Sequence, residues 1–388
     1  MFKVDAPALP YADPWNIPLH ERMRMLVRGK RKVAYFYEAP NNSTFRYRAY
    51  NMAQVINETA NHDVSASFFF LDDWSRIGEV VEYADVLVIC RSRYCHRVNQ
   101  LVMKFHLRGK RVLFDIDDFV FDTNYAHLIL NTLNEDPNDP TRWDYWFSYI
   151  GRLGQTLKLC DGAITTNQFL AAKIGEFSGL PVAVVPNFMN KEQLAYSDDI
   201  FRRKQASEFM RDDKIHLGYF SGSPSHKLDY AIIESSLEEL LKKNPKIEVT
   251  VVGYIDVGPA LGKFGDRVKR KPFHDYVNLQ RLIGDVEFNL MPLQSNSFTD
   301  CKSELKYFEA AVVGATSIAS PSYTYAGAIR DGENGYISQA HQWTDVIERA
   351  IDNLPASRQM IEIAREDARS KYAWFNHRET ILAALNLL

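Results

Sequence analysis

The chain has 388 residues, of which 46% are hydrophobic and 24% are charged, and its formal net charge is −3 at pH 7. This length is enough for two domains of ordinary size, and the near-neutral charge gives no indication of nucleic-acid binding. The four cysteines form no C-x-x-C pair and no Cys/His set at zinc spacing, a pattern typical of reduced thiols. With no signal peptide and no apolar run of about 18 residues, we expect a cytoplasmic globular protein.

Residues 1–31 are predicted to form a proline-rich arm and a short basic helix. The segment from Leu19 to Lys32 carries six basic residues against the single acidic Glu21. Basic residues beside Met23 and Val27 suit an anionic membrane surface, but we favour the simpler interpretation of a solvated helix packing on its own domain. The basic residues are Arg22, Arg24, Arg28, Lys30, Arg31 and Lys32.

From residue 32 to about residue 200, short apolar segments alternate with amphipathic ones. Near-continuous apolar strands separated by helices indicate a parallel sheet covered on both faces. We therefore predict a Rossmann-like first domain over 32–200. Its expected strands are 32–37, 65–70, 86–90, 111–115, 162–166 and 182–186.

A polar stretch over 201–214 is the expected linker, and a second alternating series follows over 215–355. Its expected strands are 215–220, 247–253, one near Val268, 286–292, 316–320 and 335–337. Residues 356–388 are predicted to be helical. The fold class that follows is α/β, with two Rossmann-like domains.

Two arginines, Arg46 and Arg48, follow the loop at the end of the first expected strand. Open α/β sheets bind ligands at the carboxyl ends of their strands, so these side chains are candidates to hold a phosphate or an acidic acceptor group. The alternative is a salt-bridged start of a helix.

The run LFDIDDFVFD places Asp115, Asp117, Asp118 and Asp122 just after the expected strand 111–115. Clustered carboxylates repel one another, so we expect at least one raised pKa and a group able to take a proton. Asp117 is the candidate general base or hydrogen-bonding partner of a sugar. Helix capping by aspartate, or a D-x-D metal site, are the alternatives. His96, His106 and His127 are the other candidate bases.

Aromatic residues crowd the segment DPNDPTRWDYWFSYI. Aromatic rings stack on sugar faces, but stripes at this spacing are more often core. We assign Trp146 to the core and leave Trp143 open between the two.

The second domain opens with LGYFSGSPSHKLDYAII. Small residues such as Gly222 and Ser223 let the backbone approach a ligand, and Lys227 lies where the next helix is expected to begin. The pattern suits a phosphate cradle but is no Walker A loop. A structural turn is the alternative.

The segment 299–320 is predicted to hold one helix followed by a buried strand. Leu305, Phe308 and Val312 form its apolar stripe, and Gly314 ends it. Another face carries three charged residues at i, i+4 and i+7, which fall within roughly 60° of arc: Lys302, Lys306 and Glu309. Lysines at a helix start strengthen its positive field, which suits a diphosphate, and a glutamate two turns later can accept hydrogen bonds from sugar hydroxyls. A solvated lysine face is the alternative.

The run KYFEAAVVGATSIAS resembles the K-x-x-E segment of GT-B glycosyltransferases, in particular glycosyltransferase family 4. The resemblance implies that Glu309 holds the nucleotide ribose and that Lys306 and Lys227 face the diphosphate. Two departures stand out. Cys301 replaces the usual first glutamate, with Asp300 beside it and Glu304 after it, and Asp117 takes the place of the histidine of a His-Asp pair.

A narrower resemblance to bacterial enzymes of surface polysaccharide and O-antigen synthesis rests on FRYRAYN, DIDDFVFD, GYFSGSPSH and KSELKYFEAA. It implies a hexosyltransferase-like enzyme with a nucleotide-sugar donor and a glycan or glycolipid acceptor, no metal cofactor, terminal helices crossing back to the first domain, and peripheral contact with the inner membrane. The predicted catalytic residues are Asp117, Asp118 and Lys306; the predicted substrate-binding residues are Arg46, Arg48, Gly222, Ser223, Lys227, Lys302, Glu304 and Glu309. The rivals are a metal-dependent D-x-D transferase or phosphatase and a non-catalytic carbohydrate-binding protein.

Overall fold

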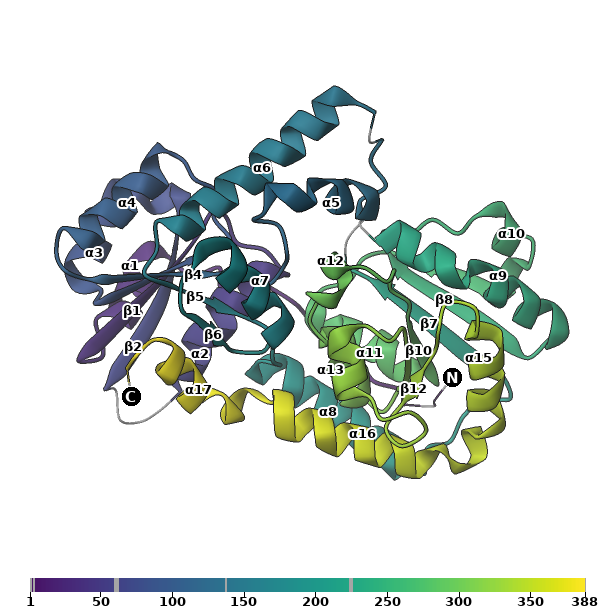
Figure 1. The fold of residues 1–388 in the computed structure, drawn as a ribbon. Helices are drawn as coiled ribbons and strands as arrows, with labels where there is room; N and C mark the ends of the chain where they lie inside the picture. Colours follow the sequence, from purple (N-terminus) through teal and green to yellow (C-terminus); the bar gives the residue numbers. More distant parts are fainter. Residues whose placement is uncertain (1, 3, 59–62, 137, 223–225, 388) are drawn as a thin grey trace.

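The computed structural model describes residues 2, 4–58, 63–136, 138–222 and 226–387, which form two α/β halves (Figure 1). Each half contains a six-stranded sheet in which all neighbouring strands run parallel. The prediction of two Rossmann-like halves is confirmed, and each expected strand is present within a few residues of its expected position.

The first sheet has the order β2-β1-β3-β4-β5-β6, so the chain begins one strand from an edge, adds β2 at that edge and then adds β3 to β6 toward the other edge. Its strands are β1 (Arg31–Tyr37), β2 (Val64–Phe70), β3 (Val86–Cys90), β4 (Arg111–Asp115), β5 (Gly162–Thr165) and β6 (Val182–Val184). Its helices are α1 (Leu19–Leu26), α2 (Asn51–Asn57), α3 (Ile77–Tyr83), α4 (His96–His106), α5 (Ala126–Thr132), α6 (Pro140–Lys158) and α7 (Gln168–Ser178), with a π-helical turn at Arg46–Tyr50.

The second sheet has the order β12-β11-β10-β7-β8-β9. Its strands are β7 (Ile215–Ser221), β8 (Ile247–Gly253), β9 (Val268–Lys271), β10 (Phe288–Met291), β11 (Thr316–Ala319) and β12 (Tyr336–Ile337). The helices from the connection onward are α8 (Lys191–Ala206), α9 (Lys227–Lys243), α10 (Pro259–Gly262), α11 (Tyr276–Asp285), α12 (Ser297–Asp300), α13 (Leu305–Ala311), α14 (Tyr323–Ala328), α15 (Trp343–Asp352), α16 (Ser357–Tyr372) and α17 (Arg378–Ala384).

Successive residues of a strand point to opposite faces of the sheet and therefore pack in different hydrophobic cores. In β1, Val33 and Tyr35 join one hydrophobic cluster, whereas Ala34 and Phe36 join another on the opposite face of the sheet. The first of these clusters also contains buried residues of α11, α13 and α16, so it runs without interruption from one domain into the other. A continuous core of this kind couples the two halves through apolar burial rather than through a linker alone.

The chain connects the two halves three times. The N-terminal arm reaches the second domain, where the Phe2 amide donates to the Asp285 carbonyl at 2.9 Å, before α1 packs on β2 of the first domain. Helix α8 makes the second crossing and includes the first part of the stretch predicted as a linker. Helix α16 and then α17 make the third, and α17 contacts α2.

The segment predicted as one helix with Lys302, Lys306 and Glu309 on one face is different in the structure. Helix α13 begins at Leu305, and Lys302 lies in the bend between α12 and α13. A residue of the later helix α14 stabilises the bend, because Thr324 Oγ1 donates a hydrogen bond to the Lys302 carbonyl at 2.8 Å. Gly314 has φ +71°, as expected of the residue that ends the helix, and a Cβ there would lie 3.1 Å from the Phe201 ring.

Lys204 on α8 is a buried cation that caps the end of this segment. Its Nζ donates to the Gly314 carbonyl at 2.8 Å and lies 3.9 Å from the centroid of the Phe2 ring. Burial lowers the pKa of Lys204 to about 7, although Glu287 and Asp285 oppose the shift.

We expect the free energy of unfolding to rise with pH between about 7 and 10 through Lys204, because its unfolded pKa of about 10.4 lies above its folded value and the unfolded chain binds the extra proton there. The slope is at most about 1.4 kcal/mol per pH unit. Urea denaturation at pH 7, 8 and 9 should show this slope reduced in Lys204→Met and retained in Lys242→Met, a control on an exposed lysine. Equal slopes in all three proteins would contradict the assignment.

Among the helices described, none combines the length and the apolar character needed to cross a bilayer.

Candidate functional site

The loops at the carboxyl ends of the two sheets meet each other. Asn167, after β5, donates to the Cys301 carbonyl at 2.9 Å, and Asn187, after β6, donates to Ser303 Oγ at 3.0 Å. Burial and then the Asp118 carboxylate raise the pKa of the Cys301 thiol, which places Asp118 close to the second domain. Asp118 of the first domain and the Cys301–Ser303 segment of the second domain therefore belong to one region of the molecule.

The second domain contributes two lysines, Lys302 and Lys306, and one histidine, His226, around the buried carboxylate of Asp229. Asp229, fully buried on α9, lies 2.9 Å from His226 Nδ1 and accepts a 2.9 Å hydrogen bond from the Gln294 amide. Burial and then the nearby Lys306 lower the pKa of His226 to about 4, so this imidazole is neutral at pH 7.

Lys306 is a predicted site residue whose pKa is strongly lowered in the structure. Burial lowers its pKa to about 8, with Asp229 opposing the shift and Lys302 adding to it. Its Nζ lies 5.2 Å from the centroid of the Tyr219 ring. Burial and the neighbouring Lys302 both disfavour the charged form of Lys306. A bound anion would stabilise that charged form, which is the property required of a diphosphate site.

The neighbouring loop between β7 and α9 is only partly described. Gly222 is exposed and a Cβ would meet no atom there within 4 Å, and Ser223 lies outside the described residues. Lys227 is the first residue of α9 and is exposed. Their predicted roles stay predictions. Sequence reasoning missed His226 and Asp229, whose i, i+3 spacing at a helix start was the available signal.

Glu309 is buried in a network that bridges the domains. Its Oε1 accepts 2.7 Å and 3.0 Å hydrogen bonds from the Tyr47 hydroxyl and Gln193 Nε2. Arg46 Nη2 lies 3.6 Å from the same oxygen, with its guanidinium 3.9 Å from the Tyr47 ring centroid and 4.3 Å from that of Tyr276. The structure thus places the Arg46 charge against Glu309 inside the protein, and the predicted role of Arg46 in holding a phosphate or an acidic acceptor group stays a prediction.

Arg48, predicted for the same role, also has its charge paired inside the protein, and its ligand-binding role stays a prediction. The side chain is fully buried and forms a bidentate pair with Asp115 at 2.7 and 3.0 Å, and its Nη1 donates to the Val185 carbonyl at 2.7 Å. Burial raises the pKa of Asp115 to about 6 although Arg48 opposes the shift. The acidic run does contain a carboxyl of raised pKa, but Asp115 lies in the core and cannot reach a substrate.

Glu304, predicted to bind substrate, is largely removed from solvent. Burial raises the pKa of its carboxyl although Tyr372 of α16 and Lys371 oppose the shift, and its substrate-binding role stays a prediction. Lys302 keeps its ammonium near the Phe298 ring, 4.9 Å from the centroid.

Asp117 and Asp118 are held by a residue that sequence reasoning missed. Arg91 Nη1 lies 3.4 Å from Asp117 Oδ1, and its Nη2 lies 3.7 Å from Asp118 Oδ2. Thr44 Oγ1 donates to Asp117 at 3.1 Å. The Asp117 side chain keeps 13% of its surface exposed, so it remains accessible.

Arg91 itself has φ +33°, an unfavourable backbone conformation for a residue with a side chain. Such strain persists where the surroundings hold it and is concentrated at functional sites. The signal in the sequence was an arginine immediately after the buried strand β3.

Within the described ranges, no three His, Cys, Asp or Glu side chains are gathered so as to hold a metal ion. The carboxylates of DIDD are instead divided between two arginines: Arg48 pairs with Asp115, and Arg91 faces Asp117 and Asp118.

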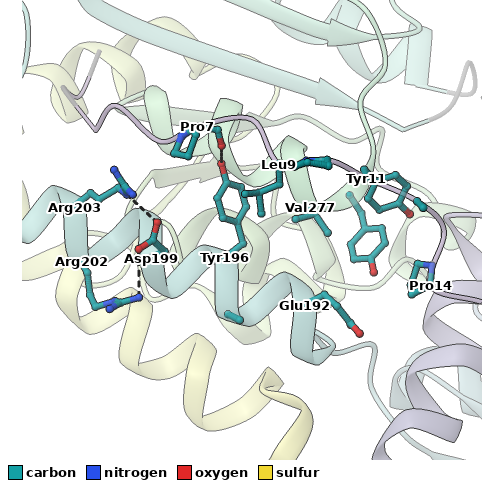
Figure 2. A pocket seen from close by; sticks show the side chains of 14 residues that line it. Pro7, Leu9, Tyr11, Pro14, Glu192, Tyr196, Asp199, Arg202, Arg203 and Val277 are labelled. Atoms are coloured by element: carbon teal, nitrogen blue, oxygen red, sulfur yellow. Dashed lines mark hydrogen bonds and ion pairs between the residues drawn. The ribbon is translucent and has the colours of Figure 1, made fainter.

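A separate cavity of about 610 Å³ lies under the N-terminal arm, between the arm, α8 and α11 (Figure 2). Its polar groups are already paired: the Tyr196 hydroxyl donates to the Pro7 carbonyl, and Asp199 bonds Arg202 and Arg203. The predicted catalytic and substrate-binding residues are not among its lining residues.

No protein-family model matches the chain, and no curated protein matches its sequence. Solved structures do match its fold. HepE from Anabaena in complex with UDP covers 92% of this chain over 100% of its own, with a TM-score of 0.62 and 12% identity. A glycosyltransferase from Rickettsia africae gives a TM-score of 0.62 at 11% identity, covering 92% of this chain and 98% of its own.

WaaG, a glycosyltransferase involved in lipopolysaccharide biosynthesis, covers 91% of this chain and 99% of its own, with a TM-score of 0.55 at 15% identity. At these identities the likeness shows the fold. The predicted fold class, GT-B with two Rossmann-like domains, is confirmed.

Proposed function

We propose that this protein is a glycosyltransferase that moves a hexosyl group from a UDP-sugar to a glycan or glycolipid acceptor. The observation that carries the proposal is the desolvated Lys306 beside Lys302 and His226, on the side of the second domain where Asp118 of the opposite domain faces Cys301. The HepE structures in complex with UDP and UDP-glucose support the choice of donor.

In the proposed reaction an acceptor hydroxyl attacks the anomeric carbon of the donor, and the bond from that carbon to the diphosphate breaks. The leaving diphosphate gains negative charge, which Lys306 and Lys302 stabilise by charge and hydrogen bonding. The hydroxyl proton passes to Asp117, whose carboxylate is oriented by Thr44 and Arg91. Lys227 is proposed to complete the diphosphate contacts as the donor binds.

The proposed ribose contact is Glu309. All three of its contacts with Tyr47, Gln193 and Arg46 fall on Oε1. We propose that ribose hydroxyls bind the Oε2 side of the carboxylate.

We expect Glu309→Gln to weaken UDP binding by about 1–2 kcal/mol, because the neutral amide is a poorer acceptor for two hydroxyls. Tyr47→Phe, which removes only a hydrogen bond to the other oxygen, is expected not to weaken it. Calorimetric titration with UDP measures both variants. Unchanged affinity in a folded Glu309→Gln protein would rule out the ribose contact.

We further propose a role in bacterial cell-surface polysaccharide synthesis at the cytoplasmic face of the inner membrane. The exposed end of the basic helix supports contact with anionic lipid: Arg24, Arg28, Lys30 and Arg31 are exposed around Val27, which is 43% exposed. Arg22 takes no part, since it forms a buried bidentate pair with Asp73 at 2.6 and 2.8 Å.

Thermal unfolding with UDP, UDP-glucose and other nucleotide sugars tests the donor. A ligand at a hundred times its Kd stabilises the folded state by about 2.7 kcal/mol, so the true donor should raise Tm clearly. Release of UDP in the presence of bacterial glycolipid extract then tests turnover. No stabilisation by any nucleotide sugar would reject the proposal, and stabilisation by sugars alone, without turnover, would favour the carbohydrate-binding alternative.

A further inference from the structure

Helix α6 carries several aromatic side chains, of which some pack on the first-domain core and others are exposed. It extends from the first domain beside α5, which contacts α9 of the second domain (Figure 1). Trp143 and Trp146 are half-buried against the first-domain core, as predicted for Trp146. Tyr145, in contrast, is 53% exposed. An exposed tyrosine beside two inward tryptophans contributes little to the core and is available for binding.

The exposed tyrosine is one of a pair. The rings of Tyr145 and Tyr149, one helical turn apart, have centroids 6.4 Å apart and an interplanar angle of 30°. Tyr149 is partly buried against the first-domain core, and the Trp146 ring lies edge-on to both tyrosines at 5.3 Å from each. Trp146 and Tyr149 thus fix the position of the exposed Tyr145 ring, whose face suits the apolar C–H face of a sugar.

Hydrogen-bonding groups border the inner end of this pair. The Arg93 guanidinium lies 5.3 Å from the Tyr149 ring centroid and is paired with Glu38 at 2.5 to 3.1 Å. Both side chains remain partly exposed, at 35% for Arg93 and 22% for Glu38. Charged groups beside an aromatic face are the combination that recognises sugar hydroxyls and ring faces together.

The aromatic surface leads to the proposed reaction centre. Arg93, which lies against the Tyr149 ring, is two residues from Arg91, and Arg91 faces Asp117 and Asp118. A chain laid over Tyr145 and Tyr149 would therefore deliver its end toward Asp117.

We propose that Tyr145, Tyr149, Arg93 and Glu38, here called the α6 platform, bind the sugar chain of the acceptor several units away from the reacting hydroxyl. The inference rests on the proposed function and names its acceptor as an oligosaccharide or polysaccharide rather than a single sugar.

The helix supplies a matched control. Phe147 is 46% exposed on another side of α6, so Phe147→Ala removes a similar aromatic surface outside the platform. We would measure wild type, Tyr145→Ala and Phe147→Ala on a printed array of bacterial polysaccharides and defined oligosaccharides of one to six units. The α6 platform predicts wild-type binding that strengthens with chain length, an approximately tenfold loss in Tyr145→Ala, and wild-type behaviour in Phe147→Ala.

Binding of UDP-glucose, measured by calorimetry in the same three proteins, should stay equal. The α6 platform is overturned if wild type binds no glycan on the array, if both variants behave as wild type, or if both lose binding equally. It is also overturned if only binding to vesicles of anionic phospholipid falls in Tyr145→Ala, which would identify the helix as a membrane contact. Failure of the donor site would appear separately, as absent UDP-glucose binding in wild type.

Discussion

Replacing Lys306 by alanine is expected to lower kcat by about 10²–10³-fold, the loss typical of removing one preorganised group from a developing negative charge. Acceptor KM should change little, because the ammonium acts on the leaving group. The fold should survive, since the variant removes a desolvated cation whose pKa burial lowers to about 8. Steady-state kinetics with purified donor and acceptor give both constants.

The pH dependence of kcat/KM for the donor is a second test of the role of Lys306. The free enzyme loses the Lys306 proton above about pH 8, so kcat/KM for the donor should fall on the alkaline side of that value. Lys306→Arg keeps the positive charge and should move this decline to higher pH. Lys242→Ala, on the exposed side of α9, is the lysine control. A raised acceptor KM with unchanged kcat in Lys306→Ala would assign the lysine to another site.

Asp117→Asn is expected to lower turnover by about 10²–10⁴-fold, the range of a lost general base, while UDP affinity stays near that of wild type. The amide can still accept the hydrogen bond from Thr44 but cannot take a proton. Asp122→Asn is the local control, since Asp122 caps the turn at Thr123–Tyr125 through its 3.0 Å contact with the Asn124 amide.

The same experiment separates the proposed mechanism from a D-x-D metal site. We expect activity to persist in EDTA, because Lys306 and Lys302 supply positive charge where the diphosphate is proposed to bind. Activity lost in EDTA and restored by Mn²⁺ or Mg²⁺, together with weaker UDP binding in Asp117→Asn, would establish the metal-dependent alternative instead.

Most strands were predictable because they are short, nearly continuous apolar runs, a pattern that depends on the local sequence alone. Strand β9, with the sequence VKRK, lacks this pattern and was expected only near Val268. The Lys302–Glu309 helix was not predictable, since the bend before Leu305 is held by Thr324, a residue more than twenty positions away. Leu305 is nevertheless the start of a helix in which Phe308 and Val312 are buried as expected.

For the site residues, the sequence does not contain the information on which partner each side chain meets. Arg46, Arg48 and Glu304 are polar side chains in the segments that follow strands, and their internal partners come from distant parts of the chain. Only the tertiary structure brings Arg48 to Asp115 and leaves Asp117 accessible. Arg91 was missed because one arginine after a strand is a weak signal, and His226 because its i, i+3 spacing to Asp229 at a helix start is also common.

The three crossings between the domains also have a consequence for how the chain folds during its synthesis. The arm that carries Phe2 bonds to Asp285, and buried α17 residues such as Ile381 complete the core next to α2. At about 5–20 residues per second, the ribosome needs on the order of tens of seconds to supply these partners. Helix α2 therefore stays uncovered until α17, which follows the second domain in the chain, has been synthesised. The native state of the first domain forms only after translation has passed the second domain.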